Sequence, residues 1–275
     1  PAAEAWRRFS KDKVAVSFLV VFAAYLVVAL AGAAVEILGP DTPLYLLTLA
    51  EQGLDVPETA TPPSGDHWLA WLGTTSAGKS VLLRVFHGTK VAFLVGLMGA
   101  GLSVLVGTML GLVSGFFGGW IDELVQYVYS TVASIPYLLL MLALAFVVRQ
   151  GPIAAWYDDL WLSDYVSLGL FNIVLVIGMT SWVTLCRLVR AEVKKVRELE
   201  YVQAARALGI AWPRILLRHV LPNVFHLVII NFSLRFVTAI KSEVILTFLG
   251  VGVDKEPSWG QMISDAKNEL MRGIW

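Results

Sequence analysis

Long runs of residues without charge dominate this chain. Four windows contain no Asp, Glu, Lys or Arg, and each exceeds the roughly 20 residues that a helix needs to cross about 30 Å of hydrocarbon. These windows are Val14–Val35, Val91–Ile121, Leu124–Val148 and Tyr165–Cys186. A fifth apolar segment runs from Val220 to Val253 and is interrupted by Arg235, Lys241 and Glu243. The pattern predicts five spanning helices, at about 14–38, 91–117, 121–149, 165–190 and 219–250.

The composition agrees with a membrane protein. Hydrophobic residues make up 57% of the chain and charged residues 15%, and the mean hydropathy is +0.71. A soluble domain of this size could not bury so much apolar surface, so we predict an all-α, polytopic helical bundle. The net charge of zero gives no indication of nucleic-acid binding, and the single cysteine, Cys186, excludes an internal disulfide. The first apolar core is longer than that of a usual signal peptide, which favours a retained helix.

The distribution of basic residues predicts the orientation. Arg7, Arg8, Lys11 and Lys13 precede the first span, and eight of the 21 basic residues lie between Arg187 and Arg218. Because cytosolic segments are enriched in Lys and Arg, residues 1–13 and 187–218 are expected in the cytosol. Residues 39–90 then form an external loop that ends in an interfacial helix, and residues 91–275 form the core. Trp275 is expected outside, with a sixth span after it.

One span carries a ridge of small residues. They recur every fourth position, at Gly99, Ser103, Gly107, Gly111 and Gly115. Small side chains at this spacing let a second helix approach closely, so we predict a packing seam, either within the chain or between subunits. In the next span Pro136 is expected to kink the helix.

The segment Gly73–Ser80 matches the phosphate-loop pattern G-x4-G-K-[ST]. A phosphate loop works when a buried strand enters the glycine-rich turn and the following helix directs its N-terminus at the phosphates. Residues 62–72 contain no convincing strand, and the predicted topology places Lys79 outside the cell. We interpret the match as coincidental; the alternative is a membrane-bound nucleotide-hydrolysing enzyme that uses this loop.

A polar segment near residue 200 is unusual in so apolar a chain. Residues Glu198–Leu208 are good helix formers, and Gly209 suits the C-terminal cap. A solvated loop helix is the simplest interpretation. However, Gln203-Ala204-Ala205 is followed after three residues by Gly209, and after nine more by His219, Val220 and Leu221-Pro222.

This order resembles the EAA loop of ABC importer permeases, although Gln203 replaces the usual Glu and His219 stands at the usual Ile position. Further segments resemble the second, C-like, permease of dipeptide and oligopeptide importers. They are Leu72–Thr75, Gly115–Trp120, Ser134–Pro136, Phe248–Gly252 and Pro257–Gly260.

The resemblance implies a non-catalytic subunit of the bacterial inner membrane that forms half of a translocation pore. Its implied partners are a second related permease, two cytosolic ABC ATPases that bind ATP and Mg, and an external substrate-binding protein. The chain itself would hold no cofactor. The helix at 198–209 would couple to an ATPase through Tyr201, Gln203, Ala204, Ala205, Arg206, Leu208 and Gly209. The solute could be a dipeptide, an oligopeptide, a metal chelate or a modified peptide.

The fifth span carries polar residues on one helical face. Asn231, Arg235, Thr238 and Ser242 step by four, three and four residues. We predict that they line the pore; the alternative for Arg235 is an ion pair at a subunit interface. His67, His87 and His226 show no metal-ligand spacing. An exporter or channel that assembles without ATPases also remains an alternative.

Overall fold

The computed structural model describes residues 10–38, 62–65, 68–76, 78–159, 163, 166–254 and 256–272. All regular elements in these residues are helical, which confirms the predicted all-α class. Residues 1–9 of the predicted cytosolic segment, residues 39–61 of the predicted external loop, His67 and Trp275 lie outside the described residues.

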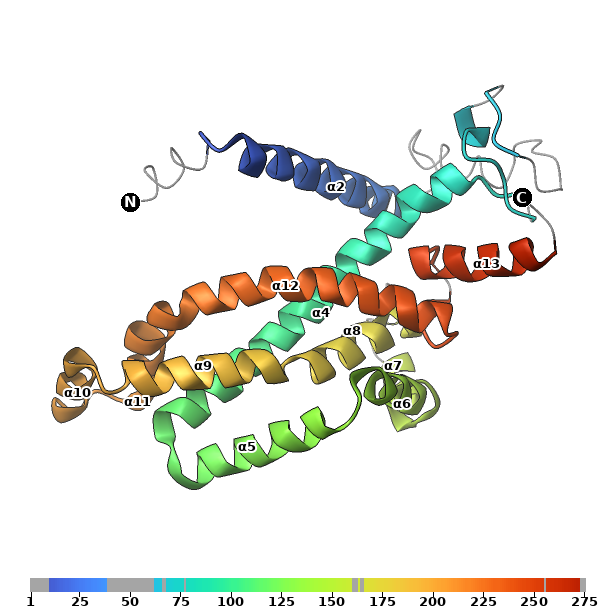
Figure 1. The fold of residues 1–275 in the computed structure, drawn as a ribbon. Coiled ribbons are helices and arrows are strands. Elements are labelled where there is room, and N and C mark those ends of the chain that lie inside the picture. Colours follow the sequence, from blue (N-terminus) through green and yellow to red (C-terminus); the bar gives the residue numbers. More distant parts are fainter. Residues whose placement is uncertain are drawn as a thin grey trace. The chain divides into compact units, whose positions relative to one another are not determined.

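The helices follow one another along the chain as Figure 1 shows. They are α2 (Lys13–Leu38), the 3-10 turn η1 (Trp68–Ala70), α4 (Val81–Phe117), α5 (Gly119–Ser134), α6 (Tyr137–Gln150), α7 (Pro152–Asp158), α8 (Leu168–Ser181), α9 (Val183–Val196), α10 (Glu200–Ala207), α11 (Trp212–Ile215), the π-helical turn η3 (Leu216–Val220), α12 (Leu221–Phe248) and α13 (Trp259–Met271). Three starts carry a serine cap: Ser167 accepts from the Leu170 amide and Ser258 from the Gln261 amide, each at 3.2 Å, and Ser80 accepts from the Leu83 amide at 3.4 Å.

Three continuous helical segments of the described chain are long and apolar enough to cross a membrane. They are Lys13–Ala34, Val81–Phe117 and Trp212–Phe248. Two further pairs meet the same criterion only when taken together: α5 with α6, bent by 96°, and α8 with α9, bent by 41°. Counting each pair as one span gives five, the number expected from the sequence. The structure therefore replaces two expected continuous spans with broken ones, and the bend at Pro136 is far larger than a kink.

The expected interfacial helix at 76–90 is not a separate element. It is the first part of α4, which continues without a break from Val81 to Phe117. No proline lies in this stretch, so every residue keeps its backbone N–H and the helical hydrogen bonds can continue from the polar beginning into the apolar part.

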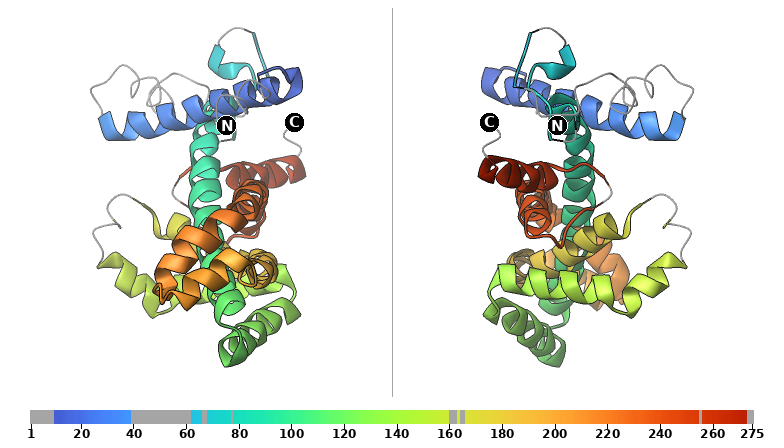
Figure 2. Two further views of the ribbon diagram at one scale, coloured as in Figure 1. Left: turned by 90° about the vertical axis from the view of Figure 1, so that its left-hand side faces the viewer. Right: turned by 90° about the vertical axis from the view of Figure 1, so that its right-hand side faces the viewer.

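Residues 94–255 form one compact unit around a continuous apolar core. Helices α9 and α12 lie side by side in it, as Figures 1 and 2 show from different directions. The core joins the end of α4 to α9, α10 and the start of α12. Its buried residues are Val104, Leu112, Phe116, Leu185, Val189, Val193, Val196, Val202, Ala205, Ile215, Leu216, Val220 and Val224.

Residues 10–93 and 256–272 belong to a second unit, built from α2, the beginning of α4 and α13. The indole of Trp259 donates to the Val85 carbonyl at 3.1 Å and lies against Gly88, where a side chain would clash with it. Arg84 pairs with Asp265 at 2.7 Å. These contacts fix α13 against the first turns of α4.

Candidate functional site

The polar segment near residue 200 folds as a short helix with a well-formed end. Helix α10 ends at Ala207, and Gly209 follows with φ of 73°. The Gly209 amide donates to the Arg206 carbonyl at 2.9 Å, and the Ile210 amide donates to the Ala205 carbonyl at 3.1 Å. This pair of bonds is a Schellman motif, which needs a residue with positive φ and so favours glycine at 209.

Helix α10 has one face turned into the protein and one turned outward. Val202 is fully buried and Ala205 is 5% exposed, and both belong to the core described above. Tyr201, Gln203, Ala204, Arg206, Leu208 and Gly209 are exposed. Among the seven residues predicted to couple to an ATPase, Ala205 therefore anchors the helix to its own chain. The exposed surface also carries Leu208, 80% exposed, and Trp212, 53% exposed.

Side chains from neighbouring helices hold this surface in place. The guanidinium of Arg206 lies 4.3 Å from the centre of the Phe116 ring, and Arg197 donates to the Gly115 carbonyl at 3.2 Å. The Gln203 amide donates to the Glu198 carbonyl at 3.1 Å, a bond that a glutamate at this position could not make because it has no donor when ionised. These contacts tie α10 to the end of α4 and to the turn that precedes it.

Two residues outside the predicted set also position the surface. Asn223, in the first turn of α12, donates to the Tyr201 hydroxyl at 2.9 Å and to the His219 carbonyl at 2.6 Å. The rings of Tyr201 and His219 lie 6.2 Å apart. His219 lies in the π-helical turn that joins α11 to α12. The sequence offered a signal here, since His219 and Asn223 flank the Leu-Pro step, but it did not show that they contact Tyr201.

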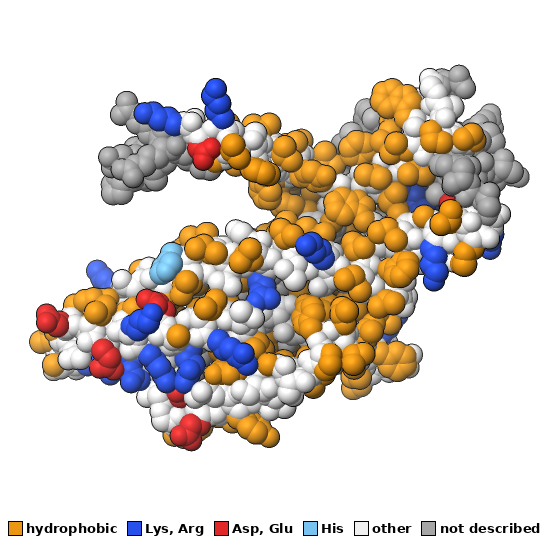
Figure 3. Space-filling view, in the orientation of Figure 1, with side chains coloured by type: hydrophobic (Ala, Val, Ile, Leu, Met, Phe, Trp, Pro, Cys, Tyr) orange, Lys and Arg blue, Asp and Glu red, His pale blue; other side chains and the backbone are white. Residues whose placement is uncertain are grey.

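A buried acidic residue joins α5 to α9. The Asp122 carboxylate accepts from the Arg190 guanidinium at 2.8 Å and from the Lys194 ammonium at 2.7 Å. Asp122 has 9% of its side chain exposed, against 18% for Arg190 and 37% for Lys194. Basic side chains gather over α9 in Figure 3, so Asp122 offsets part of a crowded positive charge.

The ridge of small residues packs inside the chain, against α8 and α9. A Cβ atom added at Gly111 would lie 2.8 Å from the Val189 Cβ and 2.9 Å from the Cys186 carbonyl oxygen. At Gly107 and Gly115 it would lie 2.8 Å from the carbonyl oxygens of Trp182 and Arg190. Gly99 faces Ile177, and Ser103 is buried. Gly99, Gly107, Gly111 and Gly115 therefore face residues of the α8–α9 region of the same chain.

The two helix breaks meet at a cavity of about 430 Å³. One wall comes from the Ser134-Ile135-Pro136 step between α5 and α6, and the other from the bend between α8 and α9. The hydroxyl of Tyr137, at the start of α6, lies 3.0 Å from the Ser181 hydroxyl and 3.3 Å from that of Ser242. Tyr137 thus links the first break to both α8 and α12.

The four polar residues predicted to line a pore are placed differently from one another. Arg235 lines the cavity, while Ser242 is buried and reaches Tyr137. Asn231 is buried and donates to the Leu227 carbonyl at 2.9 Å, and the hydroxyl of Thr238 donates to the Leu234 carbonyl at 2.8 Å. Asn231 and Thr238 therefore donate to carbonyls of their own helix, and of the four residues Arg235 is the one that lines this cavity.

Sequence comparison identifies the family. Residues 107–272 match the binding-protein-dependent transport system inner membrane component, and residues 1–45 match the N-terminal TM domain of oligopeptide transport permease C. The chain belongs to this transport permease family. It is a membrane protein of the bacterial inner membrane, and the predicted resemblance to the C-type permeases is confirmed.

Three relatives illustrate the match. The chain is 32% identical to the dipeptide transport system permease protein DppC of Bacillus subtilis (strain 168), over 99% of this chain and 75% of the relative. It is 32% identical to the oligopeptide transport system permease protein OppC of the same organism, over 78% and 64%. It is 28% identical to the glutathione transport system permease protein GsiD of Pectobacterium atrosepticum, over 98% and 80%.

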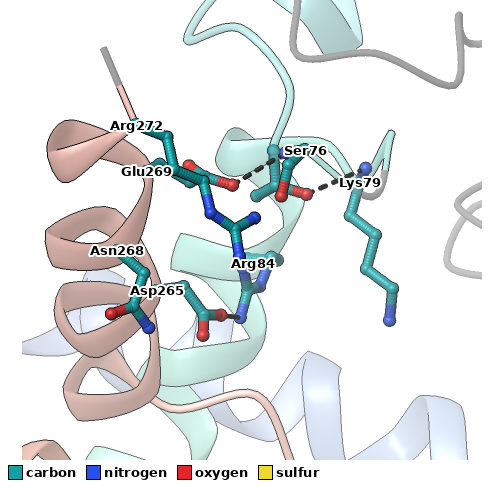
Figure 4. A pocket seen from close by; sticks show the side chains of 8 residues that line it. Ser76, Lys79, Arg84, Asp265, Asn268, Glu269 and Arg272 are labelled. Atoms are coloured by element: carbon teal, nitrogen blue, oxygen red, sulfur yellow. Dashed lines mark hydrogen bonds and ion pairs between the residues drawn. The ribbon is translucent and has the colours of Figure 1, made fainter. Parts of the chain in front are cut away.

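In this permease the phosphate-loop match has a different structure from a nucleotide site. The turn η1 precedes the loop instead of a strand, and the Ser76 amide donates to the Glu269 carboxylate of α13 at 2.7 Å. Figure 4 shows Asp265 beside Arg84, and Lys79 pointing away from both acidic side chains. The Ser76 amide is therefore occupied by a carboxylate of the same chain, where a phosphate loop would use its amides to hold phosphate.

The described residues contain no group of three His, Cys, Asp or Glu side chains arranged to hold a metal ion. His226, one of the three histidines whose spacing in the sequence does not suggest a metal site, has a ring nitrogen 3.0 Å from the Asn223 carbonyl oxygen of its own helix.

Proposed function

We propose that this chain forms half of the pore of an ATP-driven peptide importer and couples to a cytosolic ATPase through α10. The relatives named for dipeptide, oligopeptide and glutathione transport support a peptide or peptide-like solute. A second permease, two ATPases and an external binding protein complete the assembly. ATP and Mg are bound by the ATPases, and this chain supplies no catalytic group.

The observation that carries the proposal is the surface of α10. Val202 and Ala205 fasten the helix to the core shared by α4, α9 and α12, while Leu208 and Trp212 present apolar surface outward. An exposed apolar patch with a charged surround is typical of a protein contact. Because α10 is fastened to that shared core, a force applied to α10 by an ATPase moves these helices rather than only a loop.

Co-purification tests this coupling. The chain would be affinity-purified in detergent together with the other subunits of its transporter, and ATP hydrolysis would be measured. Ala204→Arg places a bulky charge on the exposed face of α10. Ala191→Arg makes the same change at an exposed position of α9, outside the surface, and serves as the matched control. Ala205→Arg is unsuitable, because it would disrupt the core itself.

We expect the wild type and the Ala191→Arg variant to retain the ATPases, and the Ala204→Arg variant to lose them. Wild-type protein that transports solute without bound ATPases would instead support a channel or exporter. Hydrolysis by the isolated chain that disappears with Lys79→Ala would support a nucleotide site at Gly73–Ser80 and contradict the proposal.

A further inference from the structure

The cavity at the two helix breaks has a positively charged lining. Arg187 from α9 and Arg235 from α12 both border it, and its lining contains no Asp or Glu. Hydroxyl groups add hydrogen-bonding capacity, among them those of Tyr137, Thr180 and Ser181. A cavity of this size, with a few convergent polar groups among apolar ones, has the character of a small-molecule site.

Arg235 is the unusual member of this lining. It is half-buried in the apolar helix α12, and within the described part of the chain it has no carboxylate at ion-pair distance. A guanidinium in the apolar part of a membrane helix is unfavourable unless an anion or water meets it. Arg187, by contrast, stacks over the Tyr129 ring at 4.6 Å, which holds its charge at the cavity.

The start of α6 adds to the positive character. Pro136 has an extended backbone with ψ of 125°, so α6 begins anew at Tyr137 and does not continue α5. Both Tyr137 and Leu140 of its first turn line the cavity. The first amides of a helix have no acceptor within it and carry partial positive charge, which favours a nearby anion. Broken helices whose N-termini meet an anionic solute are a known arrangement in membrane transporters.

We propose that this cavity binds the carboxylate of the transported solute, with the guanidinium of Arg235 as its principal partner and Arg187 as a second cation. The inference rests on the proposed importer function and deepens it, because it specifies solutes with a free carboxylate, such as peptides with an unmodified C-terminus. A guanidinium suits this role since it can donate two parallel hydrogen bonds to one carboxylate.

Uptake of two matched probes tests the proposal. The whole complex would be reconstituted in vesicles with its binding protein, and uptake of trialanine would be compared with uptake of its C-terminal amide. Arg235→Gln removes the charge but keeps a polar side chain. Arg235→Lys keeps the charge but cannot donate two parallel hydrogen bonds to one carboxylate. Lys241→Gln removes an exposed cation from the same helix outside the cavity and is the control.

For Arg235→Gln we expect trialanine uptake to fall roughly tenfold to a hundredfold, the range for a lost charged hydrogen bond. Uptake of the amide should stay within about twofold of the wild type, with Arg235→Lys intermediate. Lys241→Gln should change neither.

Equal loss of both probes with Arg235→Gln would overturn the proposal. Arg235 would then meet a fixed anion, either a carboxylate of the partner permease or a lipid headgroup. Unchanged uptake of both probes would also overturn it, because the cavity would then lie off the solute path. If the wild-type complex takes up neither probe and retains no ATPases, the importer function itself fails, and this outcome is distinct from the other two.

Discussion

Replacing Gly111 by alanine should destabilise the protein even though alanine is the better helix former. The new Cβ would lie 2.8 Å from the Val189 Cβ and 2.9 Å from the Cys186 carbonyl oxygen. Neither atom is the end of a flexible side chain, so α4 and α9 must move apart. Such overpacking costs about 1–3 kcal/mol, against a gain of about 1 kcal/mol in helix propensity.

Gly101 provides a matched control on the same helix. A Cβ there would meet nothing within 4 Å, so Gly101→Ala should keep only the propensity gain. The difference between the two variants therefore isolates the packing term of about 1–3 kcal/mol. For a protein of this size, 1 kcal/mol shifts the melting temperature by roughly 2–4 °C. We expect Gly111→Ala to melt about 2–12 °C below Gly101→Ala.

The protein contains its own reporter for this assay. Cys186 is the single cysteine and is fully buried in α9, so a thiol-reactive fluorophore labels it only when the helices separate. The melting curve would be recorded with purified protein in detergent, with tryptophan fluorescence as an independent measure. Equal melting temperatures for the two alanine variants would refute the close approach of α4 to α9. A lower melting temperature measured by Cys186 labelling but not by tryptophan fluorescence would indicate local opening of the helices, and not the global destabilisation predicted here.

Two further predictions use the same melting assay. Asp122→Asn should destabilise the protein by about 2–3 kcal/mol, below the usual range for a broken buried pair because Lys194 keeps contact with solvent. The control, Glu192→Gln, breaks the exposed pair with Lys195 and should change the melting temperature little. Equal changes in melting temperature for the two variants would contradict the argument from burial. Gly209→Ala should lower the stability by about 1 kcal/mol because alanine is strained at positive φ, while its Cβ would meet nothing within 4 Å. An unchanged melting temperature would contradict the requirement for positive φ at this cap.

The coupling segment shows how far local pattern can be followed in this protein. The run of helix-forming residues and the glycine after it were enough to locate α10 and its C-terminal end. Helix propensity and the need for positive φ at a cap are both local properties of the sequence. It could not separate Ala204 from Ala205. Which alanine is buried depends on where α9 and α12 lie beside α10, and only tertiary packing determines this.

Sequence by itself determined that the chain is helical, spans a membrane and belongs to a transport permease family. The charge-free windows determine the helical class and the membrane location, because each window is a run of consecutive residues. The short motifs, in their order along the chain, indicate the family. The tertiary structure decided where two spans break, that the glycine ridge meets α9, and that Asp122 lies between Arg190 and Lys194. It also brought Arg187 and Arg235 to one cavity. These arrangements join residues distant in sequence, so they follow from how helices pack and not from any local pattern.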